Sequence, residues 1–102
     1  MPGPETTLVV GPMTAFHIVL SGRVQGVGFR WFAESLAGEY AVTGYVRNLA
    51  DGRVEILAQA DEEILKAFCE ALRRGPSWSR VVNVSIKRVP MEPDLRGFQI
   101  RF

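Results

Sequence analysis

The sequence SGRVQGVGFR, residues 21–30, places three glycines and two arginines between an apolar run and a helical pattern. Glycine adopts left-handed backbone conformations without strain, so such a turn can point successive N–H groups toward one centre and cradle an anion. The amino end of the following helix and the planar guanidinium of Arg30 would strengthen that attraction. The stretch therefore predicts a strand–turn–helix unit with an anion site at the turn.

Two familiar phosphate loops do not fit this stretch. Its glycine spacing, G-x₃-G-x-G, differs from the dinucleotide-binding fingerprint, and no Gly-Lys-Ser/Thr follows as a P-loop requires. A purely structural alternative is a tight turn into a helix that leaves Arg30 exposed to solvent. The spacing alone does not decide between this alternative and an anion site.

The residues on either side of the turn predict the elements that it joins. Residues 15–21 are apolar and rich in strand-forming side chains, which indicates a first strand. After the turn, apolar residues recur at i, i+3, i+4, i+7, i+8 and i+11, which predicts one face of a helix. This expected core face comprises Phe29, Phe32, Ala33, Leu36, Ala37 and Tyr40.

Further along the chain, the pattern predicts four strands and a second helix. The strands are expected at residues 42–48, 53–60, 82–87 and 98–102, and the helix at residues 61–74. The expected core face of this second helix comprises Ile64, Leu65, Phe68 and Leu72. The order β-α-β-β-α-β with a short fifth strand indicates an α+β, ferredoxin-like sandwich, with two helices on one face of a mostly antiparallel sheet.

This topology brings one distant residue to the glycine turn. A right-handed crossover makes the first two strands parallel, so their carboxyl ends lie at the same edge of the sheet. Asn48 ends the second strand and shares its face with Val42 and Val46. If those valines face the helices, Asn48 points toward the first helical turn, where Arg30 lies.

Composition limits the class of protein. The chain of 102 residues has a net charge of +1, which predicts one domain and argues against binding nucleic acid through phosphate neutralisation. Residues 1–14 are expected to form a flexible tail, and residues 15–102 the domain. We expect a cytoplasmic protein, because Cys69 has no partner for a disulfide and no signal peptide or membrane span is recognisable.

Five segments together resemble the acylphosphatase family: GRVQGVGFR, GYVRN, DGRVEI, GPSWSRV and GFQIRF. The resemblance spans residues 15–102. Members of this family are small hydrolases with the ferredoxin-like fold that cleave acyl phosphates into a carboxylate and inorganic phosphate. The resemblance implies the same activity here, with no metal and no cofactor. It also implies a small-molecule acyl phosphate as substrate. We further expect no nucleic-acid or membrane partner, and a monomer.

The resemblance also implies roles for individual residues. Arg30 would bind the phosphoryl oxygens, and Asn48 would hold and orient the attacking water. The phosphate cradle would be the loop backbone of Arg23, Val24, Gln25, Gly26, Val27 and Gly28. Leu49 stands where some members carry a hydroxyl, so we expect no support for Asn48 from that side chain. Trp31 lies off the apolar helical face, where it either shapes the pocket mouth or is merely exposed or partly packed.

Two alternatives come from other functional classes. The first is a non-catalytic accessory module that binds phosphate or carbamoyl phosphate, since similar domains occur within larger maturation proteins. The second is an RNA-binding sheet, because residues 96–102, RGFQIRF, superficially resemble an RNA-recognition motif. The aromatic spacing of that segment is wrong for base stacking, which argues against the second alternative.

Overall fold

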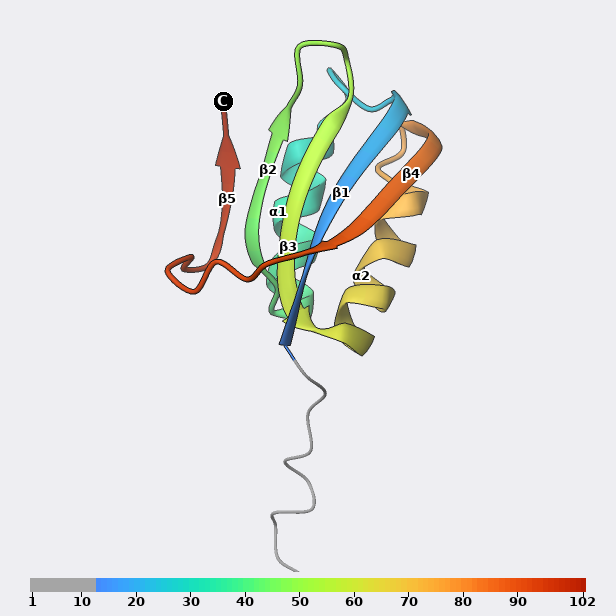
Figure 1. Cartoon of the computed structure of the whole chain (residues 1–102). Helices are drawn as coiled ribbons and strands as arrows, with labels where there is room; N and C mark the ends of the chain where they lie inside the picture. Colours follow the sequence, from blue (N-terminus) through green and yellow to red (C-terminus); the bar gives the residue numbers. More distant parts are fainter. Residues whose placement is uncertain (1–12) are drawn as a thin grey trace, which may run out of the picture.

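In the computed structural model, which describes residues 13–102, two helices pack on one face of a five-stranded sheet (Figure 1). The elements are β1 (Met13–Arg23), α1 (Phe29–Tyr40), β2 (Thr43–Asn48), β3 (Val54–Asp61), α2 (Glu62–Arg74), β4 (Arg80–Val89) and β5 (Phe98–Arg101). The predicted ferredoxin-like order with a short fifth strand is confirmed. Of the expected tail, residues 1–12 lie outside the described residues, and Met13 and Thr14 belong to β1.

The strand order of the sheet is β4-β1-β3-β2-β5. β1 and β2 both run antiparallel to β3, so they are parallel to each other and end at the same edge. β5 pairs parallel to β2 and ends at that edge too (Figure 1). Three strands and the start of α1 therefore meet at one end of the molecule.

The core lies between the sheet and the two helices. α1 contributes Phe29, Ala33, Leu36 and Ala37 as buried residues, while Phe32 and Tyr40 pack against the core partly buried. The predicted core face of α1 is thus confirmed, and Phe32 and Tyr40 lie at the margin of the core. No helix within residues 13–102 is long and apolar enough to cross a membrane.

α2 begins and ends where the sequence predicts. The Asp61 carboxylate accepts hydrogen bonds from the backbone N–H groups of Glu63 and Ile64, and the helix ends at Arg74 before Gly75. Ile64 was expected in the core, and this is wrong, because its side chain is 38% exposed. The face toward the sheet follows Leu65, Phe68, Cys69 and Leu72, and Ile64 lies at its edge.

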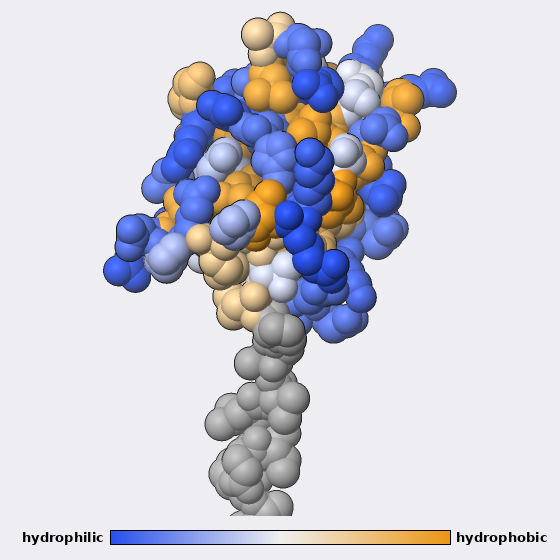
Figure 2. Space-filling view, viewed as in Figure 1, coloured by the Kyte–Doolittle hydropathy of each residue, from blue (hydrophilic) through white to orange (hydrophobic). Residues whose placement is uncertain are grey.

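The other face of the sheet is not covered by helices, and hydrophilic side chains lie over much of it (Figure 2). At its centre, Glu55 of β3 accepts hydrogen bonds from His17 of β1 and Arg47 of β2. Burial alone would raise the pKa of the Glu55 carboxyl, but the hydrogen bonds from His17 and Arg47 outweigh burial and hold that pKa below its ordinary value. This cluster ties three neighbouring strands together.

A buried amide positions the segment that leads into β5. Gln59 is only 3% exposed, and its side chain donates to the Glu92 carbonyl oxygen and accepts from the Glu92 N–H. A further bond of 3.4 Å joins Gln59 to the Thr43 hydroxyl. These contacts hold the connection between β4 and β5 against the sheet, so that β5 pairs with β2 and its last residues reach the end where β1 and β2 stop.

Candidate active site

A pocket of about 240 Å³ lies at the edge where β1 and β2 end and α1 begins. Its lining residues are Val24, Gly26, Gly28, Phe29, Arg30, Trp31, Asn48, Ile100 and Phe102. Arg30 and Asn48, which topology alone predicted to converge, thus face one cavity. The burial of Val46, and of Val42 directly before β2, supports the strand-parity argument, because Asn48 follows Val46 by two residues in the strand.

The glycine turn leaves the amino end of α1 without a side-chain cap. Gly28 is the N-cap residue with φ of 79°, a left-handed conformation that glycine adopts without strain. No side chain within residues 13–102 caps this end, and the first turn of α1 holds no acidic residue. α2, by contrast, has Asp61 as its cap and two acids in its first turn. The start of α1 therefore presents partial positive charge to the pocket.

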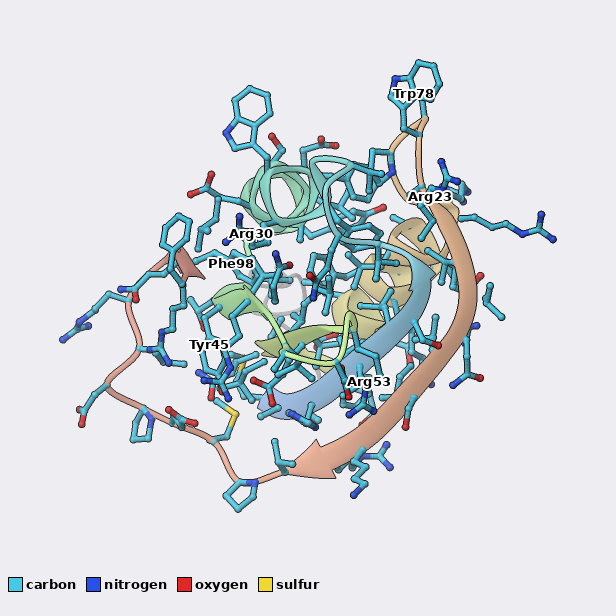
Figure 3. All side chains as sticks on the ribbon, turned by 90° about the horizontal axis from the view of Figure 1, so that it is seen from above. Arg23, Arg30, Tyr45, Arg53, Trp78 and Phe98 are labelled. Carbon is cyan, nitrogen blue, oxygen red and sulfur yellow. The ribbon has the colours of Figure 1, made fainter. Side chains whose placement is uncertain are left out.

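Arg30 adds a full positive charge to this end (Figure 3). Its guanidinium carbon lies 4.6 Å from the centroid of the Phe102 ring, which places the cation over an aromatic face. Among the described lining residues, Arg30 is the only one that carries an ionisable side chain. The pocket can thus attract and orient an oxyanion, and beside Arg30 the only polar side chain that its described lining residues offer is the Asn48 amide.

The loop residues predicted as a cradle occupy different environments. Val24, Gly26 and Gly28 line the pocket, whereas Arg23, Gln25 and Val27 do not. Arg23 is the last residue of β1, in register with Arg80 of β4. Val27 packs against the core. Gly26 and Gly28 can present only backbone to the cavity, and the longer side chains of Arg23 and Gln25 do not line it.

Gly22 was expected to help the loop wrap an anion, but it belongs to the sheet. It lies in β1 with φ of 120°, at a shift in the register between β1 and β4. A Cβ atom there would lie 2.2 Å from the carbonyl oxygen of Arg80. The close approach of β4 requires a glycine at this position, and Gly22 does not line the pocket.

Gln25 connects the loop to the hairpin that follows Asn48. Its Nε2 atom donates to the carbonyl oxygens of Leu49 and Arg53, each at 2.8 Å. The Leu49 N–H also donates to the Arg53 carbonyl oxygen at 2.8 Å, which closes the hairpin. Sequence reasoning did not assign this role to Gln25. The sequence contains only an indirect indication of this role. Leu49 offers no side-chain hydrogen bond, so another residue must support Asn48.

Two exposed aromatic residues line the pocket, and one of them was not anticipated from the sequence. Trp31 is 73% exposed and also lines the cavity, so it is both an exposed residue and part of the pocket lining. Phe102 lies beyond the end of β5 and is 99% exposed, yet its ring contacts Arg30. A terminal aromatic in a strand pattern gives no sign of such a contact.

Comparison with known proteins identifies the family. The acylphosphatase family model matches residues 16–100. The chain belongs to the acylphosphatase family. An acylphosphatase of Bacillus velezensis is 46% identical over 90 residues, which are 88% of this chain and 100% of that protein. Members of the family are hydrolases that act on acyl phosphates, so the resemblance seen in the sequence is confirmed.

Solved structures agree with this assignment. The crystal structure of acylphosphatase from Bacillus subtilis has a TM-score of 0.84 and 38% identity, and the match covers 87% of this chain and 99% of that chain. A structure of full-length HypF in the phosphate- and nucleotide-bound form has a TM-score of 0.81 and 26% identity. That match covers 93% of this chain but 12% of HypF. The acylphosphatase fold thus occurs both alone and within a larger protein.

Proposed function

We propose that this acylphosphatase hydrolyses acyl phosphates by water attack on phosphorus, with Arg30 binding the phosphoryl group and Asn48 holding the water. One observation carries the proposal: Arg30 and Asn48 line one pocket together with the uncapped start of α1. The loop from Arg23 to Gly28 would supply backbone N–H groups to the phosphoryl oxygens. No resident metal or cofactor is part of the proposed mechanism.

The chemistry matches what the pocket contains. Phosphoryl transfer passes through a loose transition state, so positioning and charge stabilisation supply most of the catalysis. The water oxygen forms a bond to phosphorus while the bond from phosphorus to the acyl oxygen breaks, and the carboxylate leaves with that electron pair. A carboxylate is a good leaving group and needs no acid. The proton of the water passes to a phosphoryl oxygen of the substrate, since none of the described lining residues has a side chain that acts as a general base near neutral pH.

Two substitutions separate the proposed roles. Arg30→Ala should abolish both turnover and inhibition by inorganic phosphate, because it removes the cation that grips the anion. Asn48→Ala should lower kcat by roughly 10²- to 10³-fold, the usual cost of one transition-state donor, while phosphate inhibition persists. Arg74→Ala and Asn83→Ala, at exposed positions of α2 and β4, serve as matched controls. Near wild-type turnover in Asn48→Ala would remove this residue from the mechanism.

The likeness to HypF supports a second candidate, a non-catalytic module that binds phosphate or carbamoyl phosphate. The two candidates differ in turnover. A catalytic chain hydrolyses acetyl phosphate faster than the buffer does, and Asn48→Ala abolishes that excess. An accessory module would bind inorganic phosphate without accelerating hydrolysis, and this result would favour the second candidate.

We also propose that the protein acts as a cytoplasmic monomer on a small molecule, without a nucleic-acid or membrane partner. The pocket is built from a single chain, and the net charge is +1. Burial raises the pKa of the Cys69 thiol to about 11, so this thiol is unreactive at neutral pH, as suits a structural residue. Sedimentation velocity with and without phosphate tests the oligomeric state.

A further inference from the structure

Three arginines and a tryptophan lie together on the surface at the end of β1, and none of them lines the pocket. Arg23 ends β1 and is the register partner of Arg80, which begins β4, so the two side chains are cross-strand neighbours. Trp78 precedes Arg80 by two residues, and Figure 3 shows Trp78 and Arg23 at one corner of the molecule. We call Arg23, Arg74, Arg80 and Trp78 the basic corner.

A tight turn brings the end of α2 to the same corner. A Cβ atom on Gly75 would lie 2.2 Å from the Ser79 hydroxyl oxygen, so these two residues are in close contact. Ser79 donates to the Pro76 carbonyl oxygen both through its N–H at 2.9 Å and through its hydroxyl at 2.7 Å. Arg74 directly precedes Gly75, so its backbone is held beside the residue that follows Trp78.

The three guanidinium groups of the basic corner form no ion pair with any of residues 13–102. Arg73, the neighbour of Arg74, instead pairs with Glu70 at 3.4 Å. Like charges on directly opposite residues destabilise an antiparallel strand pair, so Arg23 and Arg80 weaken the ladder that they end. Within the described chain nothing neutralises this concentration of charge, whereas an anionic partner would relieve the repulsion.

Apolar surface accompanies the charge. Trp78 is 79% exposed, although the turn that carries it is fixed by hydrogen bonds. Val82 is 70% exposed and lies in β4 where its register against β1 shifts between Ser21 and Gly22, and such a bulge redirects a side chain. Tryptophan and arginine contribute much of the binding energy at protein interfaces. The corner thus combines both residue types with exposed apolar area.

Two observations favour an acidic protein segment over a nucleic acid as the partner. Val82 has no planar face, so it can pack against an apolar side chain but cannot stack on a base. Residues 81–86 of β4 contain no cation, so the basic surface does not continue along the strand as a track for a phosphate backbone.

We infer that the basic corner, together with Val82, is a docking surface for an acidic segment of a partner protein that carries aspartates or glutamates around an apolar side chain. The carboxylates pair with the three guanidinium groups, and the apolar side chain covers Trp78 and Val82. This inference goes beyond the proposed function and does not depend on it, because these side chains do not line the pocket.

The test measures binding of the capped peptide EDELFEDE, which has carboxylates on both sides of a Leu-Phe pair, to the full chain by calorimetry. Arg80→Ala should weaken the affinity by about threefold, and Trp78→Ala by roughly tenfold. Arg96→Ala is the matched control, since Arg96 is exposed and lies in the connection between β4 and β5. The peptide EDEAAEDE should also bind wild type roughly tenfold more weakly than EDELFEDE. Equal affinity of wild type, Arg80→Ala and Trp78→Ala for EDELFEDE would overturn the inference.

Two further variants separate loss of binding from loss of folding. Arg80→Glu places opposite charges on residues 23 and 80, so it should keep or raise the midpoint of urea denaturation while it abolishes peptide binding. In Trp31→Phe, Trp78 is the only tryptophan, and its fluorescence emission should shift to shorter wavelength when EDELFEDE binds. Peptide binding retained in folded Arg80→Glu, or an unshifted emission at saturating peptide, would refute the docking surface.

A variant of the pocket and a second ligand identify the binding site and the class of partner. Arg30→Ala should leave the affinity for EDELFEDE within about twofold of wild type, because Arg30 lies in the pocket and not in the basic corner. Loss of peptide binding in Arg30→Ala would place the carboxylates in the pocket and overturn the inference. An oligothymidylate of the same charge should bind more weakly than EDELFEDE. Tighter binding of the oligothymidylate would assign the corner to nucleic acids and refute the protein partner.

Discussion

The side-chain amide of Gln25 donates a 2.8 Å hydrogen bond to the carbonyl oxygen of Leu49, the residue directly after Asn48. The same amide bonds the carbonyl oxygen of Arg53 across the hairpin. One side chain of the glycine loop therefore fixes the backbone that carries the proposed water ligand. The phosphate cradle and the water position are held in register by this contact, although the two segments are far apart in the sequence.

Gln25→Ala should lower kcat by about tenfold, because small misplacements of a positioning group are costly in catalysis. Inhibition by inorganic phosphate should change much less, since the backbone of the loop remains. Stability should fall by about 1–2 kcal/mol, as two carbonyl oxygens lose a donor. Gln99→Ala on the exposed side of β5 is the control. If phosphate affinity falls as far as kcat, Gln25 shapes the cradle and not the hairpin.

Gly22→Ala and Gly28→Ala should fail in different ways. A Cβ at Gly22 would overlap the Arg80 carbonyl oxygen, so we expect a loss of about 3 kcal/mol or more in urea denaturation, with phosphate affinity retained in the folded fraction. A Cβ at Gly28 meets no atom within 4 Å, and the left-handed backbone alone costs about 1–2 kcal/mol. Its phosphate affinity should nevertheless fall. If Gly22→Ala lowered phosphate affinity and Gly28→Ala did not, Gly22 would belong to the phosphate cradle.

The pH dependence of kcat should be nearly flat from about pH 6 to pH 9, because general acid–base groups that titrate in this range are absent from the described pocket. Only ionisation of the substrate phosphoryl group should add a slope at the acidic end. Measurement of kcat at saturating substrate in a series of buffers of constant ionic strength checks this. A bell-shaped profile whose pKa values stay the same when the substrate is changed would reveal a catalytic base that is not among the described lining residues.

Glu55→Gln should destabilise the fold at neutral pH and have a smaller effect at pH 3. The pKa of Glu55 is lowered in the folded state, so its stabilising contribution is complete above the unfolded value of about 4.3 and disappears as pH falls through the folded value. Since the partners His17 and Arg47 are partly exposed, we expect a loss on the order of 1 kcal/mol at pH 7. Urea titrations at both pH values check this. An equal difference at pH 7 and pH 3 would contradict an electrostatic origin.

Much of the fold was predictable because local periodicity and chain topology determine it. The apolar face of α1 and the Asp61 cap of α2 follow from residues a few positions apart. Ile64 was misplaced because periodicity gives the direction of a helix face but not how far its partner extends around it. The pairing of β5 with β2 depends on Gln59 and Glu92, which are 33 residues apart, and no local pattern encodes that contact.

The candidate site was likewise only partly predictable from the sequence. The convergence of Arg30 and Asn48 follows from the parallel arrangement of β1 and β2, which the order of elements implies. The parts played by Gln25 and Phe102 depend on side-chain directions at the ends of separate segments, and sequence spacing contains no such information. Gly22 was assigned to the loop because a glycine needed for strand contact and one needed for a turn look identical in sequence.

Because the start of α1 has no side-chain cap, the thermal stability of the protein should depend on whether an anion is bound there. A helix end that lacks a side-chain acceptor is completed by whatever anion binds there, so phosphate, the reaction product, should raise the melting temperature in proportion to the logarithm of its concentration. An acidic residue introduced into the first turn would stabilise the empty protein and repel the substrate at once. Thermal tolerance and turnover are therefore opposed at this helix end, and selection for one will act against the other.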